Sequence, residues 1–243
     1  MGENRNKEKI KACVAIAIIV LAILITVIIN IKYYVEGETN MPFNLSKMLI
    51  VSQVDTVDKT GESMISCVMQ KNDIYLSFEK NENNDDEEMI ESITIENIQI
   101  LENPQKGEVK VYMPNSSEGN LFSYKDEYMV SENKLTYKGA TKSNNKTLEV
   151  GNQGGTIVVS IANTNIGEYT PGSEISEESL LTKVGANAEE LKFKASFDVV
   201  INLKNKSYIA NVILDLPYGD EIENQGMGSK EITEGIVFRR VAK

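Results

Sequence analysis

The segment LKFKASFDVVINL, residues 191–203, decides the fold. Its apolar side chains fall on every odd position: Leu191, Phe193, Ala195, Phe197, Val199, Ile201 and Leu203. Successive side chains of a β-strand point to opposite faces, so this register predicts a strand with one buried face. The residues between them are mainly polar, which predicts that the other face meets water, as in an antiparallel sheet.

The next segment continues the pattern as the second strand of a hairpin. Apolar residues occupy the even positions from Tyr208 to Leu216, and Pro217 ends the run. The sequence KNKS lies between the two runs, and asparagine tolerates the positive φ of a tight turn. We therefore predict an antiparallel hairpin that pairs 191–203 with 208–216, with its turn centred on Asn205 and Lys206.

Further segments with strand-like patterns predict a domain of many short strands. They are SKMLIVSQV (46–54), SMISCVMQ (63–70), DIYLSFEK (73–80), ESITIENIQIL (91–101), EVKVYM (108–113), KLTYKG (134–139), GTIVVSIAN (155–163) and EGIVFRRV (234–241). Short strands separated by turn residues are typical of sandwiches and barrels. In 91–101 the alternation changes phase, which predicts a β-bulge at Glu96 and Asn97.

One segment of this region has a helical pattern, SEESLLTKV at 176–184. Ser176 is its expected N-cap, acidic residues follow in the first turn, and Gly185 is placed to end it. No fixed-period repeat or low-complexity linker divides residues 41–243. The sequence thus predicts one all-β domain over 41–243, an antiparallel β-sandwich or a jelly-roll-like variant of it.

Residues 12–31 are apolar throughout, with Thr26 and Asn30 as the only polar members. As a helix, this run would be about 30 Å long, which matches the hydrocarbon core of a bilayer. It is apolar on all sides rather than along one stripe, as a lipid-embedded helix is. We predict a transmembrane helix that contacts the bilayer through residues 12–31, between a basic cytoplasmic tail (1–11) and a linker (32–40).

A cleaved signal peptide is the main alternative for this run. The basic start suits a signal peptide, but the apolar core of such a peptide is usually only about 7–15 residues long. The nearest cleavage-like pattern is Val35-Glu36-Gly37, and no Ala-x-Ala motif is present. A retained signal anchor is the favoured interpretation, and cleavage near Gly37 is the alternative.

The flanking charges predict that the N-terminus lies inside the cell. Arg5, Lys7, Lys9 and Lys11 precede the apolar run. Only Lys32 and Lys47 follow it within about 20 residues, and basic residues favour the cytoplasmic side. Tyr33 and Tyr34 suit the outer interface. The expected protein is single-pass in the cytoplasmic membrane, with its C-terminal domain outside.

Charge also bears on the partners. Residues 1–32 carry a net charge of +3, so residues 33–243 carry −14 of the total of −11. An acidic body of this kind repels nucleic acid, so we expect no nucleic-acid partner.

The chain has no histidine. Ser-His-Asp and Cys-His catalysis and histidine-ligated zinc are therefore excluded. The cysteines are Cys13, in the apolar run, and Cys67, which lies among alternating apolar residues and is expected to be buried. No nucleophile elbow, Walker loop or dinucleotide fingerprint is present. We predict no catalytic, cofactor-binding or metal-binding residue.

The most acidic segment is NENNDDEE, residues 81–88. It lacks the spacing and central glycine of a calcium loop, so we expect a solvated hairpin loop between two strands. Weak binding of divalent cations is the lesser alternative.

Several segments resemble those of an uncharacterised group of single-pass membrane proteins from low-GC Gram-positive bacteria. They are MPFNLSKMLIVS, GGTIVVSIANTNIGEY, LKFKASFDVVI and ILDLP. The similarity runs from the anchor nearly to the C-terminus. It implies a bacterial origin and a single-pass topology. No activity is assigned to the group, so the resemblance implies no functional residue.

The function expected from the sequence is that of a membrane-anchored, extracytoplasmic binding or structural protein of the bacterial cell envelope, with an envelope protein as a partner. The alternative is a membrane-tethered hydrolase that uses paired carboxylates about 5–10 Å apart in a cleft.

Overall fold

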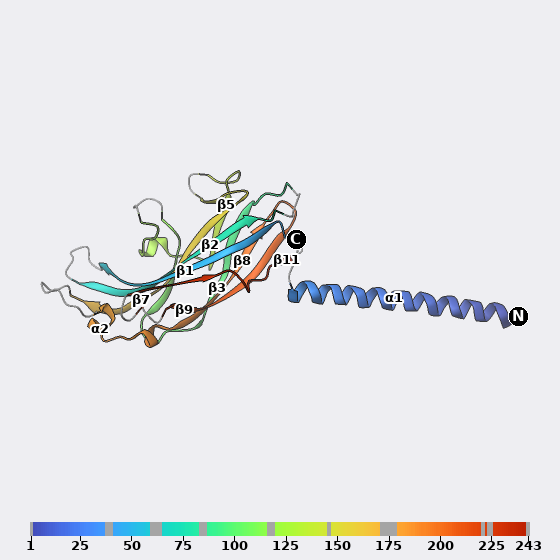
Figure 1. Ribbon diagram of the computed structural model, residues 1–243, viewed down its shortest axis with the longest axis horizontal. Helices are drawn as coiled ribbons and strands as arrows, with labels where there is room; N and C mark the ends of the chain where they lie inside the picture. The colour runs from blue at the N-terminus through green and yellow to red at the C-terminus, as the bar shows by residue number, and fades with distance from the viewer. Residues whose placement is uncertain are drawn as a thin grey trace.

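The computed structural model describes residues 2–36, 41–58, 65–82, 87–115, 120–144, 147–170, 179–219, 222 and 226–241. In this part of the chain a long N-terminal helix, α1 (Gly2–Glu36), precedes a β-rich domain (Figure 1). The strands are β1 (Phe43–Asp58), β2 (Ser66–Lys80), β3 (Ser92–Glu102), β4 (Glu108–Tyr112), β5 (Lys134–Gly139), β6 (Leu148–Val150), β7 (Gly154–Tyr169), β8 (Phe193–Asn202), β9 (Ser207–Leu216), β10 (Met227–Ile232) and β11 (Arg239–Val241).

These strands form two sheets. The order in the five-stranded sheet is β10-β1-β2-β7-β4, and the order in the six-stranded sheet is β11-β9-β8-β3-β5-β6. All neighbours are antiparallel except β5 and β6, which pair in parallel from Tyr137 opposite Leu148. The predicted all-β sandwich with one N-terminal apolar helix is confirmed.

The inner faces of both sheets share one apolar core. The odd positions of β8 from Phe193 to Ile201 are at most 4% exposed, and Ile74, Leu76 and Phe78 of β2 are at most 2% exposed. Each strand therefore places alternate side chains between the sheets, as its sequence pattern predicts.

The predicted hairpin is present. β8 pairs with β9 from Phe193 opposite Leu216 to Asn202 opposite Ser207. The N–H of Leu203 donates to the carbonyl of Lys206 at 2.9 Å and closes the loop. Asn205 is not among the described residues with positive φ, so the reason given for its place in the turn is wrong.

The predicted bulge in β3 is also confirmed. The pairing of β3 with β8 shifts register between Glu96 and Gln99, and Asn97 has a φ of 54°. The side-chain amide of Asn97 donates to a carboxylate oxygen of Asp198 at 2.8 Å, which supports this left-handed residue from the neighbouring strand.

Several strand predictions differ from the structure in their extent, and β1 and β7 are each longer than the predicted 46–54 and 155–163. Segments 63–70 and 73–80 were predicted as separate strands, but residues 66–80 form the single strand β2, because Lys71 and Asn72 continue the ladder with β1. Of 234–241 only 239–241 pair as a strand. The sequence also did not predict β6 and β10, which are short and have no sustained alternation.

The predicted helix at 176–184 is shorter than expected. α2 covers Leu180–Lys183, and its N-cap is Ser179, whose Oγ accepts from the N–H of Thr182. Ser176, the predicted cap, lies outside the described residues. Gly185 has a φ of 61°, and the N–H of Ala186 donates to the carbonyl of Leu181, so the helix ends at glycine as predicted.

The segment 81–88 is not a hairpin loop. Strand β2, before it, belongs to the five-stranded sheet, and strand β3, after it, belongs to the six-stranded sheet. The segment therefore crosses between the layers. Glu88 is partly buried there and forms an ion pair with Lys206 at 2.9 Å.

A layer of buried amides interrupts the core on the five-stranded sheet. Ser52, Gln70 and Asn72 are fully buried on the inner face. The side-chain oxygen of Asn72 accepts from Ser52 Oγ and from Gln70 Nε2, each at 2.7 Å, and its nitrogen donates to the carbonyl of Ile161 at 2.8 Å. The layer separates the main core from a smaller cluster around Val68.

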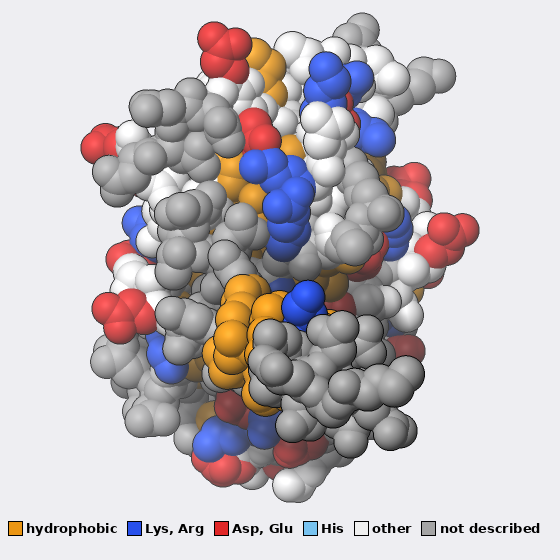
Figure 2. Space-filling view, turned by 90° about the vertical axis from the view of Figure 1, so that its right-hand side faces the viewer, with side chains coloured by type: hydrophobic (Ala, Val, Ile, Leu, Met, Phe, Trp, Pro, Cys, Tyr) orange, Lys and Arg blue, Asp and Glu red, His pale blue; other side chains and the backbone are white. Residues whose placement is uncertain are grey.

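Helix α1 is long and apolar enough to cross a membrane, and it supports a single-pass anchor. Residues Cys13–Asn30 have a mean hydropathy of 3.1, and none of this window is buried against the rest of the structure. Figure 2 looks toward this end of the molecule and shows apolar side chains of α1 in front of the β domain. Gly37, near the alternative cleavage point, lies outside the described residues.

We expect Asn72→Leu to lower the free energy of unfolding by about 2–4 kcal/mol, because buried partners of the amide lose their hydrogen bonds. Urea unfolding of the full chain in detergent, followed by circular dichroism, measures this. The same change at exposed Asn211, which donates to Asp198, is the control and should cost no more than about 0.5 kcal/mol. Equal losses at both positions would contradict a special role for the buried layer.

Candidate binding site on the five-stranded sheet

A pocket of about 350 Å³ lies on the outer face of the five-stranded sheet, and this volume falls in the range of small-ligand sites. Five different segments line it. The lining residues are Val57, Cys67, Met69, Lys110, Tyr112, Tyr124, Lys125, Asp126, Thr164 and Asn165.

The segment 120–130, which we call the strap, forms one wall of this pocket. It lies between β4 and β5 and includes a single 3₁₀ turn, η1 (Asp126–Tyr128). The strap is fixed to the edge strand β4, because Met113 donates to the carbonyl of Tyr128 at 3.0 Å and Val130 donates to that of Val111 at 2.8 Å. Phe122 of the strap packs in a separate apolar cluster on this outer face.

A β-bulge in β7 forms the opposite wall. Val68 of β2 pairs with Gly167 and Gln70 pairs with Asn163, so three residues of β7 lie opposite Met69 alone. Asn165, in the middle of the bulge, has a φ of 58°. Bulges redirect side chains next to functional sites. Here the bulge turns Thr164 and Asn165 to the pocket.

Cys67 is the thiol of the pocket. It is 9% exposed and free, and its sulfur lies 3.9 Å from the side-chain oxygen of Asn165. The prediction that this cysteine is buried is therefore confirmed, although its side chain lines the pocket on the outer face and does not lie in the core between the sheets.

Charged side chains at the pocket are paired loosely. Lys110 Nζ lies 3.7 Å from a carboxylate oxygen of Asp126 and 3.9 Å from one of Glu108, and the side chain of Asp126 is 88% exposed. Beside the pocket, Lys71 forms a closer ion pair with Asp55 at 2.8 Å. A ligand that enters the pocket can therefore replace these exposed ion pairs with its own contacts, because breaking them costs little free energy.

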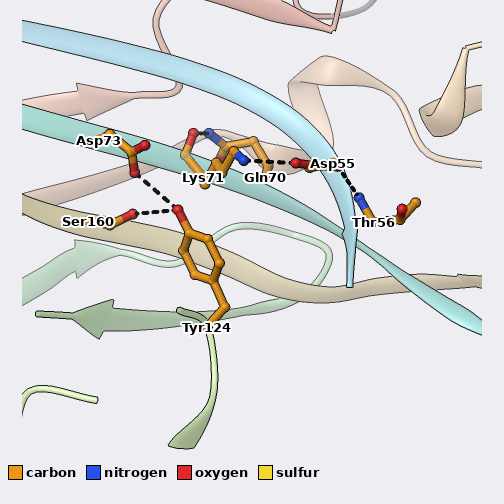
Figure 3. Close-up of polar contacts among 7 residues, drawn as sticks. All are labelled: Asp55, Thr56, Gln70, Lys71, Asp73, Tyr124 and Ser160. Atoms are coloured by element: carbon orange, nitrogen blue, oxygen red, sulfur yellow. Dashed lines mark hydrogen bonds and ion pairs between the residues drawn. The ribbon is translucent and has the colours of Figure 1, made fainter. Parts of the chain in front are cut away.

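Tyr124 ties the strap to the sheet (Figure 3). Its hydroxyl donates to Asp73 Oδ1 at 3.1 Å and lies 3.3 Å from Ser160 Oγ. Burial raises the pKa of Asp73, and hydrogen bonds from Ser160 and Tyr124 and the charge of Lys71 oppose that rise. Burial and the charge of Asp73 also raise the pKa of Tyr124. Tyr124 thus stays a protonated donor at physiological pH.

Tyr112 supports the same wall from beneath. Its ring meets that of Tyr124 edge to face, with centroids 5.1 Å apart. Burial, with Asp126 and Glu108 nearby, raises the pKa of Tyr112 to about 12. The pocket therefore combines fixed aromatic walls with amide, hydroxyl and ammonium donors, an arrangement that suits binding of a small polar ligand.

A second cavity, of about 470 Å³, contains the carboxylates nearest to the hydrolase alternative. Lys194 Nζ lies 3.3 Å from a carboxylate oxygen of Glu102 and 3.2 Å from one of Asp215. The side chains of the two acids are 69% and 79% exposed. The general acid of a glycosidase is kept protonated by burial, and neither Glu102 nor Asp215 is buried. The alternative gains no support here and stays a prediction.

No group of three His, Cys, Asp or Glu residues suited to a metal occurs among the residues that the structure describes. The sequence predicts no site residue, so the pocket is not among the predicted features. One signal could have found the bulge: apolar residues of β7 change from odd positions, ending at Ile161, to the even position of Ile166.

The raised pKa of Asp73 predicts how the stability of the domain depends on pH. Because the folded-state pKa of Asp73 is raised, folding favours its protonated form. Asp73 therefore makes its full contribution to stability at pH values below its pKa in the unfolded chain. This contribution is lost as the pH rises through its pKa in the folded domain. Asp73→Asn keeps an acceptor for Tyr124 without the charge, so the stability of the variant relative to the natural chain should increase over this pH range.

Urea unfolding of both full-length chains at a series of pH values measures that difference. Tyr124→Phe removes a hydrogen bond that lowers the pKa of Asp73. The pH at which the stability contribution of Asp73 is lost should therefore be higher in this variant. Tyr128→Phe, in the same strap, is the control and should leave that pH unchanged. If the difference in the free energy of unfolding between Asp73→Asn and the natural chain does not change with pH, the raised pKa assigned to Asp73 is wrong.

Comparison of this chain with protein-family models, with curated proteins and with solved structures gave no match. The roles given to the pocket residues therefore rest on their geometry in this structure.

Proposed function

We propose that the protein is a single-pass, membrane-anchored binding protein of the bacterial cell envelope, with its N-terminus in the cytoplasm and its β domain outside. Its pocket on the five-stranded sheet, between the strap and the β7 bulge, is the proposed ligand site. An envelope component that carries the ligand group is the expected partner.

The position of the pocket relative to the anchor carries this proposal. The first described residue of the domain, Met41, follows α1 after only four residues, 37–40. Val57, at the pocket, comes 14 residues after Phe43 along the same strand. At about 3.3 Å per residue this places the pocket roughly 45 Å from the anchored end of the domain. A site at that distance is suited to components beyond the bilayer rather than to lipid.

The charge bias around the apolar run supports the orientation. The four basic residues before it and the two after it favour a cytoplasmic N-terminus. The domain needs no disulfide to fold, because its sandwich core is extensive. Free cysteines are therefore compatible with an external domain.

Thiol labelling of intact cells tests the orientation. Asp126→Cys places a thiol at a highly exposed position of the strap, and a membrane-impermeant maleimide should label it without lysis. Lys7→Cys, in the N-terminal tail, should be labelled only after lysis. The natural chain is the control, because Cys67 is buried and Cys13 lies in the apolar helix. The reverse pattern of labelling would refute the proposed orientation.

Photocrosslinking tests the pocket. Benzoylphenylalanine at Asp126 should form an adduct in intact cells, and the same group at Asn211, exposed on the six-stranded sheet, should not. Val57→Trp fills the pocket and should abolish the adduct at Asp126 while leaving the amount of protein unchanged. Adducts that form equally at both positions, or that persist with Val57→Trp, would refute the pocket as the binding site.

A further inference from the structure

Helix α1 carries two polar side chains within its apolar run, Thr26 and Asn30. Thr26 Oγ1 donates to the carbonyl of Ala22 at 2.9 Å, and Asn30 Nδ2 donates to the carbonyl of Thr26 at 2.9 Å. The side-chain oxygen of Asn30 accepts no hydrogen bond from the residues that the structure describes. This amide therefore has an acceptor and a second N–H available for a partner.

Asn30 lies within the hydrocarbon region when residues 12–31 span the bilayer. It is roughly 13 Å along the helix axis from the middle of this run, and half the thickness of the hydrocarbon core is about 15 Å. An unpaired amide is costly there, and asparagine side chains of membrane helices hydrogen-bond across to neighbouring helices. None of the window Cys13–Asn30 is buried against the rest of this chain, and α1 extends clear of the β domain (Figure 1). A helix that pairs with Asn30 must therefore come from another chain.

Asn30 is also part of a regular pattern along α1. Positions that are spaced alternately by three and four residues form one side of a helix. Counted back from Asn30, this spacing gives what we call the Asn30 stripe: Ile16, Ile19, Ile23, Thr26 and Asn30. Both polar residues of the apolar run lie on it, and its three isoleucines are 59–61% exposed. In parallel helix pairs, a single asparagine on such a stripe fixes the register of the two helices.

The occupant that fits the stripe is α1 of a second copy. All copies cross the membrane in the same direction and to the same depth, so Asn30 meets Asn30 when two of these helices lie side by side. A carboxamide is both a donor and an acceptor, so the two amides can exchange hydrogen bonds around a two-fold axis. A purely apolar helix of another protein would leave this amide unpaired.

We propose that α1 pairs in parallel with α1 of a second copy through the Asn30 stripe. The pairing needs α1 to span a membrane, but it needs neither the proposed orientation nor a ligand in the pocket. Where the pocket binds as proposed above, the dimer presents two pockets on one patch of membrane. A ligand group that recurs along an envelope component is then held at two sites, which raises its apparent affinity.

Disulfide crosslinking in membranes tests which side of α1 faces the second copy. Full-length Cys13→Ser, whose remaining thiol Cys67 is buried, is the parent chain and the background control. Two cysteines cannot be bridged when their Cα atoms are more than about 7 Å apart, and only the contact side of the helix comes closer than this. Ile23→Cys in the parent should therefore form a disulfide-linked dimer on mild oxidation, whereas Leu21→Cys, on the opposite side, should not.

A shallow apolar hollow on a neighbouring side of α1 is the competing contact. It is lined by Cys13, Ile16, Ala17, Val20, Leu21 and Leu24. Leu24→Cys in the same parent chain probes this side. A dimer linked at Leu24→Cys but not at Ile23→Cys, equal linkage at all three positions, or no linkage at any of them would overturn the proposal.

An exchange of two residues tests the amide itself. Asn30→Ile together with Ile28→Asn keeps the composition of α1 and turns the amide by about 160° around the helix. At low protein density, crosslinking at Ile23→Cys should fall by about 3- to 30-fold, the factor that corresponds to about 0.6–2 kcal/mol for one polar pair in a membrane. Crosslinking at Leu21→Cys, on the same side as position 28, should rise.

Asn30→Gln is the conservative control, because it keeps a carboxamide on the stripe, and it should retain the crosslinking at Ile23→Cys. A crosslinking pattern that is unchanged by the exchange of positions 28 and 30 would show that Asn30 does not direct the pairing and would refute the proposal. None of these outcomes bears on the pocket, which the adduct at Asp126 tests separately.

Discussion

The shared core of the two sheets is the constraint on which the rest of the structure depends. The odd face of β8 is apolar, and so is the even face of β2 from Ile74 to Phe78, and each sheet can bury its apolar face only against the other. That burial fixes which side of every strand points outward. The outward face of β2 then carries Cys67, Met69, Lys71 and Asp73, the residues on and beside which the pocket and the strap are built.

Within this core, the amides of Gln70 and Asn72 set the register of the five-stranded sheet. Ser52 lies directly opposite Asn72 in the ladder. A shift of one residue would turn Asn72 to the outer face and bring a charged neighbour, Lys71 or Asp73, between the sheets. The polar layer therefore excludes alternative pairings at the level where the sheet approaches its bulge, and so keeps Asn165 next to Cys67.

The sequence was informative wherever a residue's environment follows from its neighbours in the chain. The alternation in 191–203 and 208–216, the phase change at Asn97 and the apolar run at 12–31 all belong to this kind, and the structure has each of these elements. The assignment of strands to sheets was not accessible in this way. The segment 81–88 looks like a hairpin loop because only tertiary packing decides that β2 and β3 enter different sheets. The pocket was missed for the same reason, since Tyr124 meets Asp73 across 51 residues and Cys67 meets Asn165 across 98.

The direction of β1 has a mechanical consequence. This strand begins beside the anchor and ends at the pocket, and it pairs with β2 from Phe43 to Asp58 and with β10 from Met48 to Gln53. A force between the far end of the domain and the bilayer pulls along β1, at right angles to its inter-strand hydrogen bonds. Such a load is shared by the whole ladder in shear and does not open the bonds one at a time. With a ligand in the proposed pocket, β1 would thus carry tension along its length, between the membrane and that ligand.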